Sequence, residues 1–259
     1  MCELFGANHA DKGMVNDLLK EFFTHGVTNP HGWGIASFYG RSISVEKQPE
    51  AAHESKYLRQ RLSADISADS LLAHIRLATV GSLEYENSHP FVMEDESGRD
   101  WTLIHNGTIF ECDLLNKYVS LQKGQTDSER ILHYLVDRMN EAMWDGDVKI
   151  TISPEDRFRI FDRLVDDITD GNKVNLLIYD GDYMYMHTNY KDSLNICQKG
   201  DGVIVSTRPL DDDVWRPLPL NTPVAYKDGK EVYRGHDHGH EFIDSEEKMK
   251  YLFLDYSGL

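Results

Sequence analysis

The chain has 259 residues, of which 40% are hydrophobic and 10% aromatic, and this is enough apolar material for a substantial core. Its 44 acidic and 27 basic residues give a formal net charge of -17, which repels nucleic acids and anionic membrane surfaces. This net negative charge excludes nucleic acids and anionic membranes as partners and favours a protein that handles small molecules.

Neither a membrane span nor a secretion signal is predicted. The chain has no run of about 18 apolar residues, and Glu3 and Asp11 interrupt its beginning with charge. Its three cysteines, Cys2, Cys112 and Cys197, lie far apart without a C-x-x-C spacing, so neither a disulfide framework nor a zinc site is indicated. We therefore expect a cytoplasmic protein with reduced thiols.

Strand and helix patterns alternate in the first half of the chain. A short strand over residues 2–7 precedes a helix over 14–24, where apolar side chains recur at helical spacing. Residues 77–101 are predicted to be mostly loop. The other elements predicted here are a hairpin over 35–39 and 42–47, a short helix over 57–62, a buried strand over 70–76 and a strand over 101–105.

Strands predominate again after two helices in the second half. One helix is predicted to begin at Thr126, where the sequence resembles a capped helix start. The other is predicted to cover residues 154–168. Strands are predicted over 174–179, 183–187, 202–206, 224–226 and 232–233. We find no linker or internal repeat, so we expect one domain over residues 1–259 with a layered α+β fold.

The beginning of the chain offers a nucleophile. If Met1 is removed, Cys2 carries a thiol and a free α-amine, whose pKa values are roughly 8.5 and 7.7–8.0, so a proton can pass between them. The alternative is that Cys2 is a small buried hydrophobe at the start of an edge strand, and for an isolated Met-Cys start that alternative is favoured.

Three further polar positions stand at the ends of predicted elements. Arg76 ends a buried strand, and Asn106-Gly107 follows the strand over 101–105, where a glycine lets the backbone turn and present its N–H. Asn-Gly is also the commonest hairpin signal, so a simple turn is an equal alternative. Asp127 lies at a helix start, and its alternative role is a helix cap.

These positions belong to motifs that resemble a known family. The motifs are Cys2, residues 74–81, residues 105–108 and residues 126–129, in this order. Together they resemble the class II glutamine amidotransferase domain. The resemblance is strongest to stand-alone members, the YafJ type and the γ-glutamyl hydrolases of ergothioneine synthesis, which share Cys-Glu-Leu-Phe-Gly, Gly-Trp-Gly-Ile, Ala-His-Ile-Arg and Glu-Asn-Ser-His-Pro-Phe. Residues 203–210 look similar too, so the match covers most of the chain.

The resemblance implies both a fold and a reaction. The fold is that of the N-terminal nucleophile hydrolases, an α+β four-layer αββα sandwich of two antiparallel sheets between helical layers. In the reaction, the Cys2 thiolate attacks the side-chain amide of glutamine, and the Asn106 amide and the Gly107 N–H stabilise the oxyanion. Ammonia leaves after protonation by the α-amine, which then activates the water that hydrolyses the γ-glutamyl thioester.

The resemblance also implies how the substrate's amino-acid end is bound. Arg76 takes the α-carboxylate in a bidentate pair, which lysine cannot reproduce, and Thr79 helps to hold it. Asp127 binds the α-ammonium, so substrates without an amino-acid head are rejected. The alternatives that remain open are a surface ion pair for Arg76 and a cap for Asp127.

The chain departs from the family pattern at a few positions. His31 stands where related stand-alone proteins often have Asp, and Leu77 and Val80 differ from synthase-linked members. No ammonia-consuming domain is expected, so ammonia passes either to a synthetase subunit or to water. We expect glutamine or a γ-glutamyl compound as the substrate and no cofactor, and a homo-oligomer stays open.

Other interpretations of the sequence are weighed against this one. A γ-glutamyl hydrolase of one metabolite and a catalytically silent glutamine-binding or partner-binding domain are the rival functions. His236, His238 and His240 alternate, and on a strand they could share one face and bind a metal. Glycine and aspartate suit a solvated loop equally well, and no carboxylate or thiol ligand set is evident in the sequence. We therefore predict no metal site.

Overall fold

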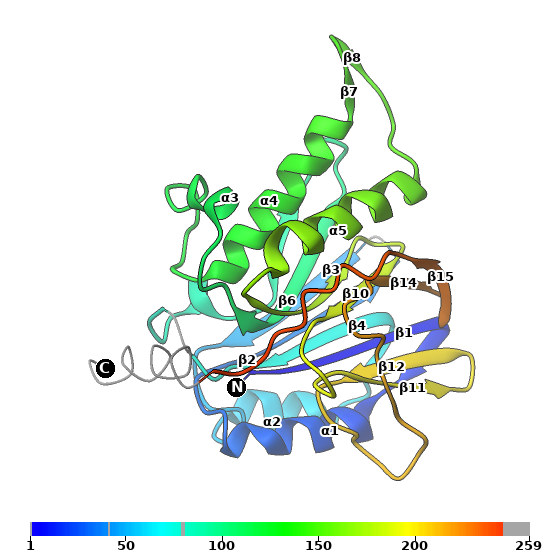
Figure 1. Cartoon of the computed structure of the whole chain (residues 1–259). Coiled ribbons are helices and arrows are strands. Elements are labelled where there is room, and N and C mark those ends of the chain that lie inside the picture. Colours follow the sequence, from blue (N-terminus) through cyan, green and yellow to red (C-terminus); the bar gives the residue numbers. More distant parts are fainter. Residues whose placement is uncertain (1, 41, 79–80, 246–259) are drawn as a thin grey trace.

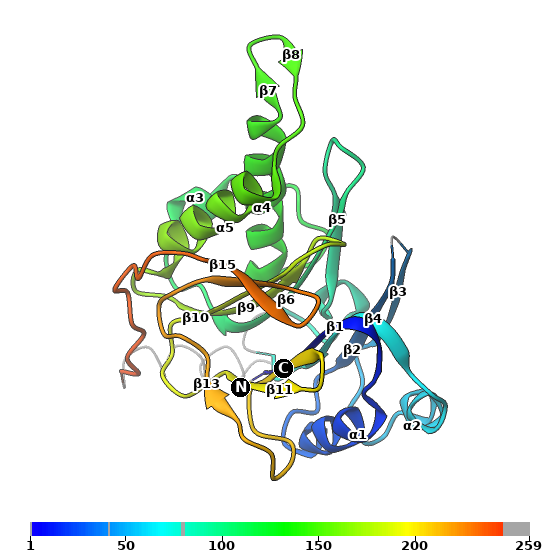
Figure 2. The same cartoon turned by 90° about the vertical axis from the view of Figure 1, so that its right-hand side faces the viewer.

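The computed structural model describes residues 2–40, 42–78 and 81–245. Within them, two antiparallel sheets lie face to face, and helices cover their outer faces (Figures 1 and 2). The helices are α1 (Asn16–Thr24), α2 (Lys56–Ser63), α3 (Asp113–Asn116), α4 (Asp127–Ala142) and α5 (Pro154–Thr169), with short 3-10 turns at His25–Val27 and Tyr85–Asn87.

Each sheet draws strands from both halves of the chain. The first sheet has the order β13-β11-β12-β1-β4-β2-β3 and the second β15-β14-β10-β9-β6-β5. The strands of the first are β1 (Glu3–Met14), β2 (Trp33–Tyr39), β3 (Ser42–Gln48), β4 (Ser67–Ile75), β11 (Asn195–Lys199), β12 (Gly202–Ser206) and β13 (Arg216–Pro217). Those of the second are β5 (Phe91–Glu94), β6 (Asp100–Thr108), β9 (Lys173–Tyr179), β10 (Met184–Thr188), β14 (Val224–Lys227) and β15 (Lys230–Arg234). A separate hairpin of β7 (Trp144–Asp145) and β8 (Val148–Lys149) projects beyond α4 (Figure 1).

Three apolar layers separate the helices and sheets. Successive side chains of β1 point to opposite faces, so Leu4 packs between the two sheets, whereas Phe5 packs with Leu19 and Phe22 of α1. The third layer lies between the second sheet and the helices α4 and α5. These layers confirm the predicted αββα sandwich.

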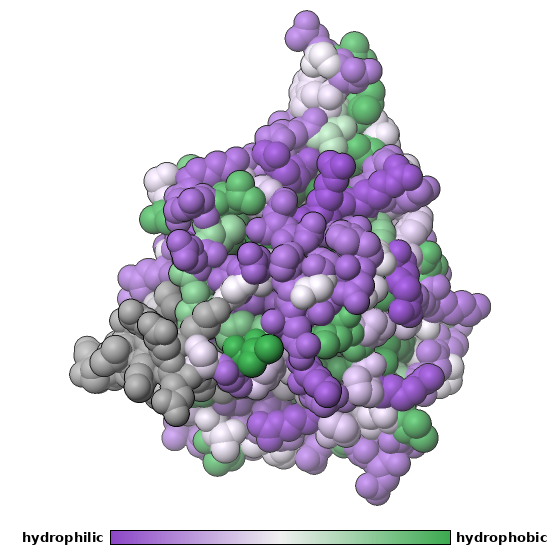
Figure 3. Space-filling model, in the orientation of Figure 1, coloured by the Kyte–Doolittle hydropathy of each residue, from purple (hydrophilic) through white to green (hydrophobic). Residues whose placement is uncertain are grey.

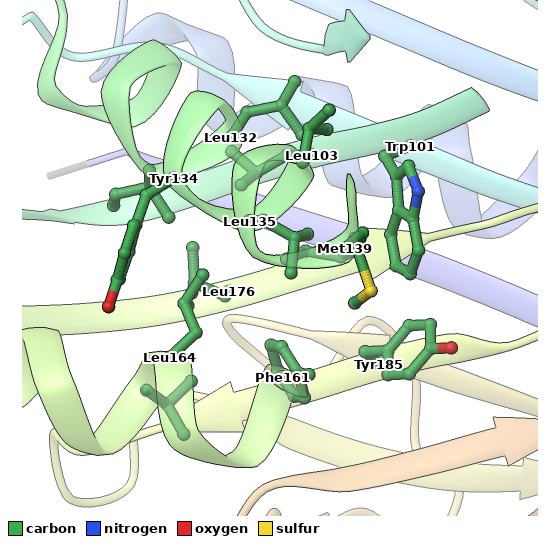
Figure 4. Packing of buried hydrophobic residues seen from close by; sticks show 14 of the residues in the cluster. Trp101, Leu103, Leu132, Tyr134, Leu135, Met139, Phe161, Leu164, Leu176 and Tyr185 are labelled. Carbon is green, nitrogen blue, oxygen red and sulfur yellow. The ribbon is translucent and has the colours of Figure 1, made fainter. Parts of the chain in front are cut away.

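Helices α4 and α5 owe their position to apolar side chains at spacings of three and four residues. On α4 these are Leu132, Leu135 and Met139, and on α5 Phe161 and Leu164. Figure 4 shows them against the side chains of the second sheet, which are Trp101, Leu103, Leu176 and Tyr185. Full burial of one such side chain contributes about 1.5–3 kcal/mol.

Most predicted elements are confirmed, but the short elements α3, β7, β8 and β13 were not predicted, and three further strands differ from the prediction. Strand β1 runs on to Met14, past an irregular register between Asn8 and Gly13, so α1 begins at Asn16. Strand β5 lies inside the stretch predicted to be mostly loop, and β11 was not predicted. β5 has four residues and β11 has five, and some of their side chains are partly exposed. The alternation of apolar and polar residues that would indicate a strand is therefore weak in both.

The surface agrees with the acidic composition. Figure 3 shows mostly hydrophilic side chains on the face that carries α4 and α5. Among the described residues, no helix is both long enough and apolar enough to cross a membrane.

Candidate active site

Cys2 directly precedes β1. Because side chains alternate along a strand, Cys2 lies on the same side as Leu4, which packs between the sheets. Its Sγ accepts a hydrogen bond from the Leu77 backbone N–H at 3.3 Å. Cys2 is partly exposed, and β1 lies between β12 and β4, so Cys2 does not stand at the start of an edge strand as the alternative interpretation has it.

The charges around Cys2 set the protonation of its thiol. Burial raises the pKa of the thiol above its ordinary value, and the Asp127 carboxylate raises it further. The Leu77 N–H and the positive charge of Arg76 act in the opposite direction. Arg76 and Asp127 therefore both lie near enough to Cys2 for their charges to act on it.

The two residues after Cys2 are held by the segment that follows β12. Thr207 Oγ1 accepts a hydrogen bond from the Leu4 N–H at 2.8 Å, and the Thr207 N–H donates to the Leu4 carbonyl at 3.0 Å. Glu3 is only 1% exposed, and its carboxylate contacts Arg208 and the His25 ring. The late sequence motif around residues 203–210 thus fixes the beginning of β1, which directly follows Cys2.

Arg76 follows the last residue of β4 and is 3% exposed, so the surface ion-pair alternative is wrong. Its guanidinium donates hydrogen bonds to the carbonyls of Ser82, at 2.9 Å, and Gly81, at 3.1 Å. The departure at position 31 has a local explanation, because His31 Nδ1 accepts a hydrogen bond from the Ala78 N–H at 3.0 Å. Thr79 lies outside the described residues.

Asn106 and Gly107 lie within β6, which continues to Thr108. They are paired with Asn175 and Val174 of β9, so the two-residue hairpin alternative is wrong. Asn106 is 3% exposed. A Cβ atom on Gly107 would lie 1.9 Å from the Lys173 carbonyl oxygen, so only glycine fits this position.

Asp127 is the first residue of α4 rather than its cap. The N-cap is Thr126, whose hydroxyl accepts a hydrogen bond from the Glu129 N–H at 3.4 Å. The Asp127 carboxylate accepts one from the Ile109 N–H at 2.8 Å, just beyond β6. The helix dipole also favours a negative charge at this end.

Two side-chain links bring the site segments together. Asn87, in the predicted motif over residues 86–91, donates to the Ser82 carbonyl and accepts from the Gln125 N–H, so it joins the loop under Arg76 to the loop before Asp127. His74 Nε2 donates to the His105 carbonyl at 3.1 Å, which joins β4 to β6. The His105 ring in turn contacts Ser128 Oγ at 3.0 Å.

Lys173 is a residue of this region that sequence reasoning missed. It lies opposite Thr108 in the pairing of β6 with β9 and is 4% exposed, with its Nζ 4.0 Å from the centre of the Tyr190 ring. Burial lowers the pKa of Lys173 to about 8, against opposing effects from Asp244 and Cys2. A lysine at the start of a strand normally indicates a solvated end, so only its position opposite the 105–108 motif could have drawn attention to it.

Comparisons with known proteins agree with this arrangement. The family model described as class II glutamine amidotransferases matches residues 1–200. YafJ of Escherichia coli (strain K12), named as a candidate glutamine amidotransferase, is 30% identical over 199 residues, which cover 73% of this chain and 74% of YafJ. The gamma-glutamyl-hercynylcysteine sulfoxide hydrolase of Mycolicibacterium smegmatis is 23% identical over 210 residues, covering 80% of this chain and 82% of its own.

A solved structure supports the same fold. The crystal structure of a predicted glutamine amidotransferase from Pseudomonas aeruginosa PA01 superposes with a TM-score of 0.62 at 21% identity. The superposition covers 90% of this chain and 100% of the chain from Pseudomonas aeruginosa. At this identity the similarity shows the fold, which is the α+β sandwich described above.

Proposed function

Since this chain belongs to the class II glutamine amidotransferases, we propose that it hydrolyses the γ-amide of glutamine, or of a γ-glutamyl compound, to glutamate through a thioester on Cys2. The observation that carries the proposal is the position of the Cys2 thiol against the Leu77 backbone, within range of the charges of Arg76 and Asp127. A nucleophile and two opposite charges suit a zwitterionic substrate.

The nucleophile acts after removal of Met1. Because burial raises the pKa of the Cys2 thiol, little thiolate is present without a base nearby. A free α-amine, with an ordinary pKa of roughly 7.7–8.0, is the base on the same residue. With Met1 attached this nitrogen is an amide and cannot take the proton, so the unprocessed chain is inactive.

The oxyanion is stabilised from β6. The Asn106 side-chain amide and the Gly107 N–H are the proposed donors, and the pairing of both residues with β9 fixes the backbone that carries them. A donor held in place before the reaction stabilises developing charge without reorganisation. Ammonia then leaves after protonation by the α-ammonium, and water hydrolyses the thioester.

The amino-acid head of the substrate is bound by opposite charges. Arg76 receives the α-carboxylate, with Thr79 as an additional contact, and Asp127 receives the α-ammonium. The hydrogen bonds from Arg76 to two loop carbonyls and from the Ile109 N–H to Asp127 support this, because they hold both charged groups in place before substrate binds.

A more specific γ-glutamyl hydrolase is the second candidate. It is favoured by the match to a protein named as a gamma-glutamyl-hercynylcysteine sulfoxide hydrolase. In that case water is the acceptor, whereas a glutamine amidotransferase passes ammonia to a synthetase subunit. A cytoplasmic location is part of the proposal and is supported by the three free cysteines.

Steady-state kinetics separate the candidates. Met1-free protein is assayed for glutamate release from glutamine and from a panel of γ-glutamyl amides. We expect turnover of at least one, abolished by Cys2→Ala and retained by Cys112→Ala, whose cysteine lies next to α3. A higher kcat/KM for a γ-glutamyl amide than for glutamine selects the second candidate. A catalytically silent domain is indicated if no substrate is turned over.

A further inference from the structure

Residues 235–245, here called the strap, follow β15 and run beside α5 (Figure 1). The strap is tied down along its length. The Gly235 N–H donates to the Pro223 carbonyl at 2.8 Å, and the Phe242 N–H donates to the Asn189 carbonyl at 2.7 Å. The Asn189 amide returns a hydrogen bond to the His240 carbonyl at 3.0 Å. The strap is therefore a fixed part of this face.

The strap presents histidines to a row of carboxylates. His236 and His240 lie on the strap, Asp162 and Asp166 lie four residues apart on α5, and Asp170, four residues further on, is the C-cap of this helix. The eight residues from Asp162 to Asp170 rise about 12 Å in a helix, and the four residues from His236 to His240 span about 13 Å when extended, so the two spacings match. Each of the two histidines therefore lies between two neighbouring carboxylates.

The contacts follow this match. His236 Nδ1 lies 2.9 Å from Asp162, and its Nε2 lies 3.6 Å from Asp166. His240 Nε2 lies 3.4 Å from Asp166, and its Nδ1 lies 3.6 Å from Asp170. The sequence alone did not show that these carboxylates meet the histidines, because they come from a helix about 70 residues earlier.

One group in this row has the composition of a metal site. Asp166, His238 and His240 each offer a ligand atom, and these atoms lie within 4.8 Å of one another. The rings of His238 and His240 are stacked, with their centres 5.3 Å apart. Ligands of a tetrahedral Zn²⁺ lie about 2.0–2.2 Å from the ion, and a modest side-chain movement reaches that geometry. The side chains of Asp166 and His240, 45% and 35% exposed, are free enough to make it.

One ring nitrogen of His238 contacts a buried neighbour. In metal-ligating histidines, the ring nitrogen that does not bind the metal usually makes such a hydrogen bond. Its Nε2 lies 2.9 Å from Nε2 of His187, which is 0% exposed on β10. Its Nδ1 lies 3.4 Å from the Thr169 hydroxyl and accepts a hydrogen bond from the His240 N–H at 3.1 Å, so a cation bound at Nδ1 takes the place of these two contacts. The ring orientation is thus fixed by neighbours on two different elements, β10 and α5.

The local charge favours a cation. Carboxylates four residues apart on a helix repel one another, and the chain carries a net charge of -17. We propose that Asp166, His238 and His240 bind a divalent zinc-type cation that joins the strap to α5. Two imidazoles and a carboxylate are ligands that zinc accepts, and the remaining coordination position is filled by water.

The inference is independent of the proposed reaction, because none of its residues belongs to the proposed catalytic set. The strap connects to that region at its far end, where Asp244 accepts a hydrogen bond from the Tyr190 hydroxyl. The ring of Tyr190 lies against Lys173. A bound cation therefore orders a segment that reaches the surroundings of the nucleophile.

Zinc titration of tag-free protein by calorimetry tests the site, with Co²⁺ absorption as a second probe. We expect one equivalent of Zn²⁺ and a tetrahedral Co²⁺ spectrum. Asp166→Asn and His240→Gln should each weaken binding at least about tenfold, equivalent to about 1.4 kcal/mol. The matched control is Asp162→Asn, which removes the same charge one turn away and should leave the affinity unchanged.

Three results would overturn the proposal. These are no saturable Zn²⁺ binding by the wild type, equal affinity of Asp166→Asn and wild type, and equal losses in Asp162→Asn and Asp166→Asn. The second result would mean that the alternating histidines chelate the metal without α5, and the third that only the overall charge matters. Circular dichroism of each variant establishes that it is folded, so that a loss of binding refers to the ligands.

Discussion

Lys173 places a positive charge near the nucleophile. Its pKa is lowered to about 8 by burial, and the Cys2 thiolate works against that lowering. Because electrostatic coupling is reciprocal, we expect the charged Lys173 side chain to favour the Cys2 thiolate. Lys173 is therefore expected to act on the reactivity of Cys2 without contacting the substrate.

Replacing Lys173 by glutamine tests this coupling. The Lys173→Gln variant loses the positive charge, so the pKa of the Cys2 thiol should rise, and the pH midpoint for alkylation of Cys2 by iodoacetamide should move upward. Lys199→Gln is the control, because Lys199, the last residue of β11, is ion-paired with Asp211 and Asp213. A midpoint that stays in place or moves downward would show that the coupling is absent.

Asn106 is the residue whose removal should affect catalysis with least effect on binding. Asn106→Ala should lower kcat by about 10²–10³, as the loss of one oxyanion donor does elsewhere, with KM changing far less. The measurement is steady-state kinetics on the best substrate found for the wild type. A fall in kcat below about tenfold, or a loss confined to KM, argues against an oxyanion role.

Sequence reasoning reached some residues of the site and missed others for identifiable reasons. Cys2, Arg76 and Asp127 lie in ordered motifs, so their proximity could be predicted from a family resemblance. Lys173 stands in no motif, and its burial depends on Tyr190 and on the strap. Such burial is set by segments that meet only in the folded chain.

At the scale of elements, β1 is held in place by the end of β12. The pair of hydrogen bonds between Leu4 and Thr207 continues the pairing of β1 with β12 beyond its last strand residue, Ser206. Leu4 is 0% exposed, so its N–H has no access to water if the threonine hydroxyl is lost. The position of the nucleophile thus depends on a segment about 200 residues later.

The Thr207→Val variant measures this dependence. Valine keeps the shape but leaves the buried Leu4 N–H without an acceptor, so the free energy of unfolding should fall by about 1–3 kcal/mol in chemical denaturation. Thr207→Ser retains the hydroxyl and should be closer to wild type. Equal stability of the valine and wild-type proteins would mean that this hydrogen bond does not hold β1.

The elements also show where sequence patterns stop being informative. Helices α4 and α5 were predictable because long apolar stripes at helical spacing have few alternative structures. The Asn106-Gly107 pair was ambiguous, because the same two residues suit a hairpin turn or a strand. Its pairing with Asn175 and Val174 of β9, nearly 70 residues later, decides for the strand.

At the scale of the whole molecule, the site lies where the two sheets meet. Cys2 and Arg76 lie next to β1 and β4 of the first sheet, and Asn106 belongs to β6 of the second. The sequence predicted two layers of strands between helices, but it did not show which strands face each other. Neither did it show that the strap lies along α5, because that contact depends on matching two different repeats.

A single domain over the whole chain remains a prediction at this scale, and differential scanning calorimetry tests it. Strands of both sheets come from both halves of the chain, so neither half has a complete core by itself. We expect one transition with equal calorimetric and van't Hoff enthalpies in metal-free protein. Two separable transitions would show that the chain contains two domains.

The central claim is that a terminal Cys2, with its own amine free, attacks the γ-carbonyl of a glutamine-like substrate. The most direct test is intact-mass and peptide mapping after reaction with a glutamine analogue that carries an electrophile at the γ position. The account predicts one adduct, on Cys2, in Met1-free protein and none in protein with an N-terminal extension. An unmodified Cys2 in Met1-free protein, or equal labelling of the extended form, would contradict it.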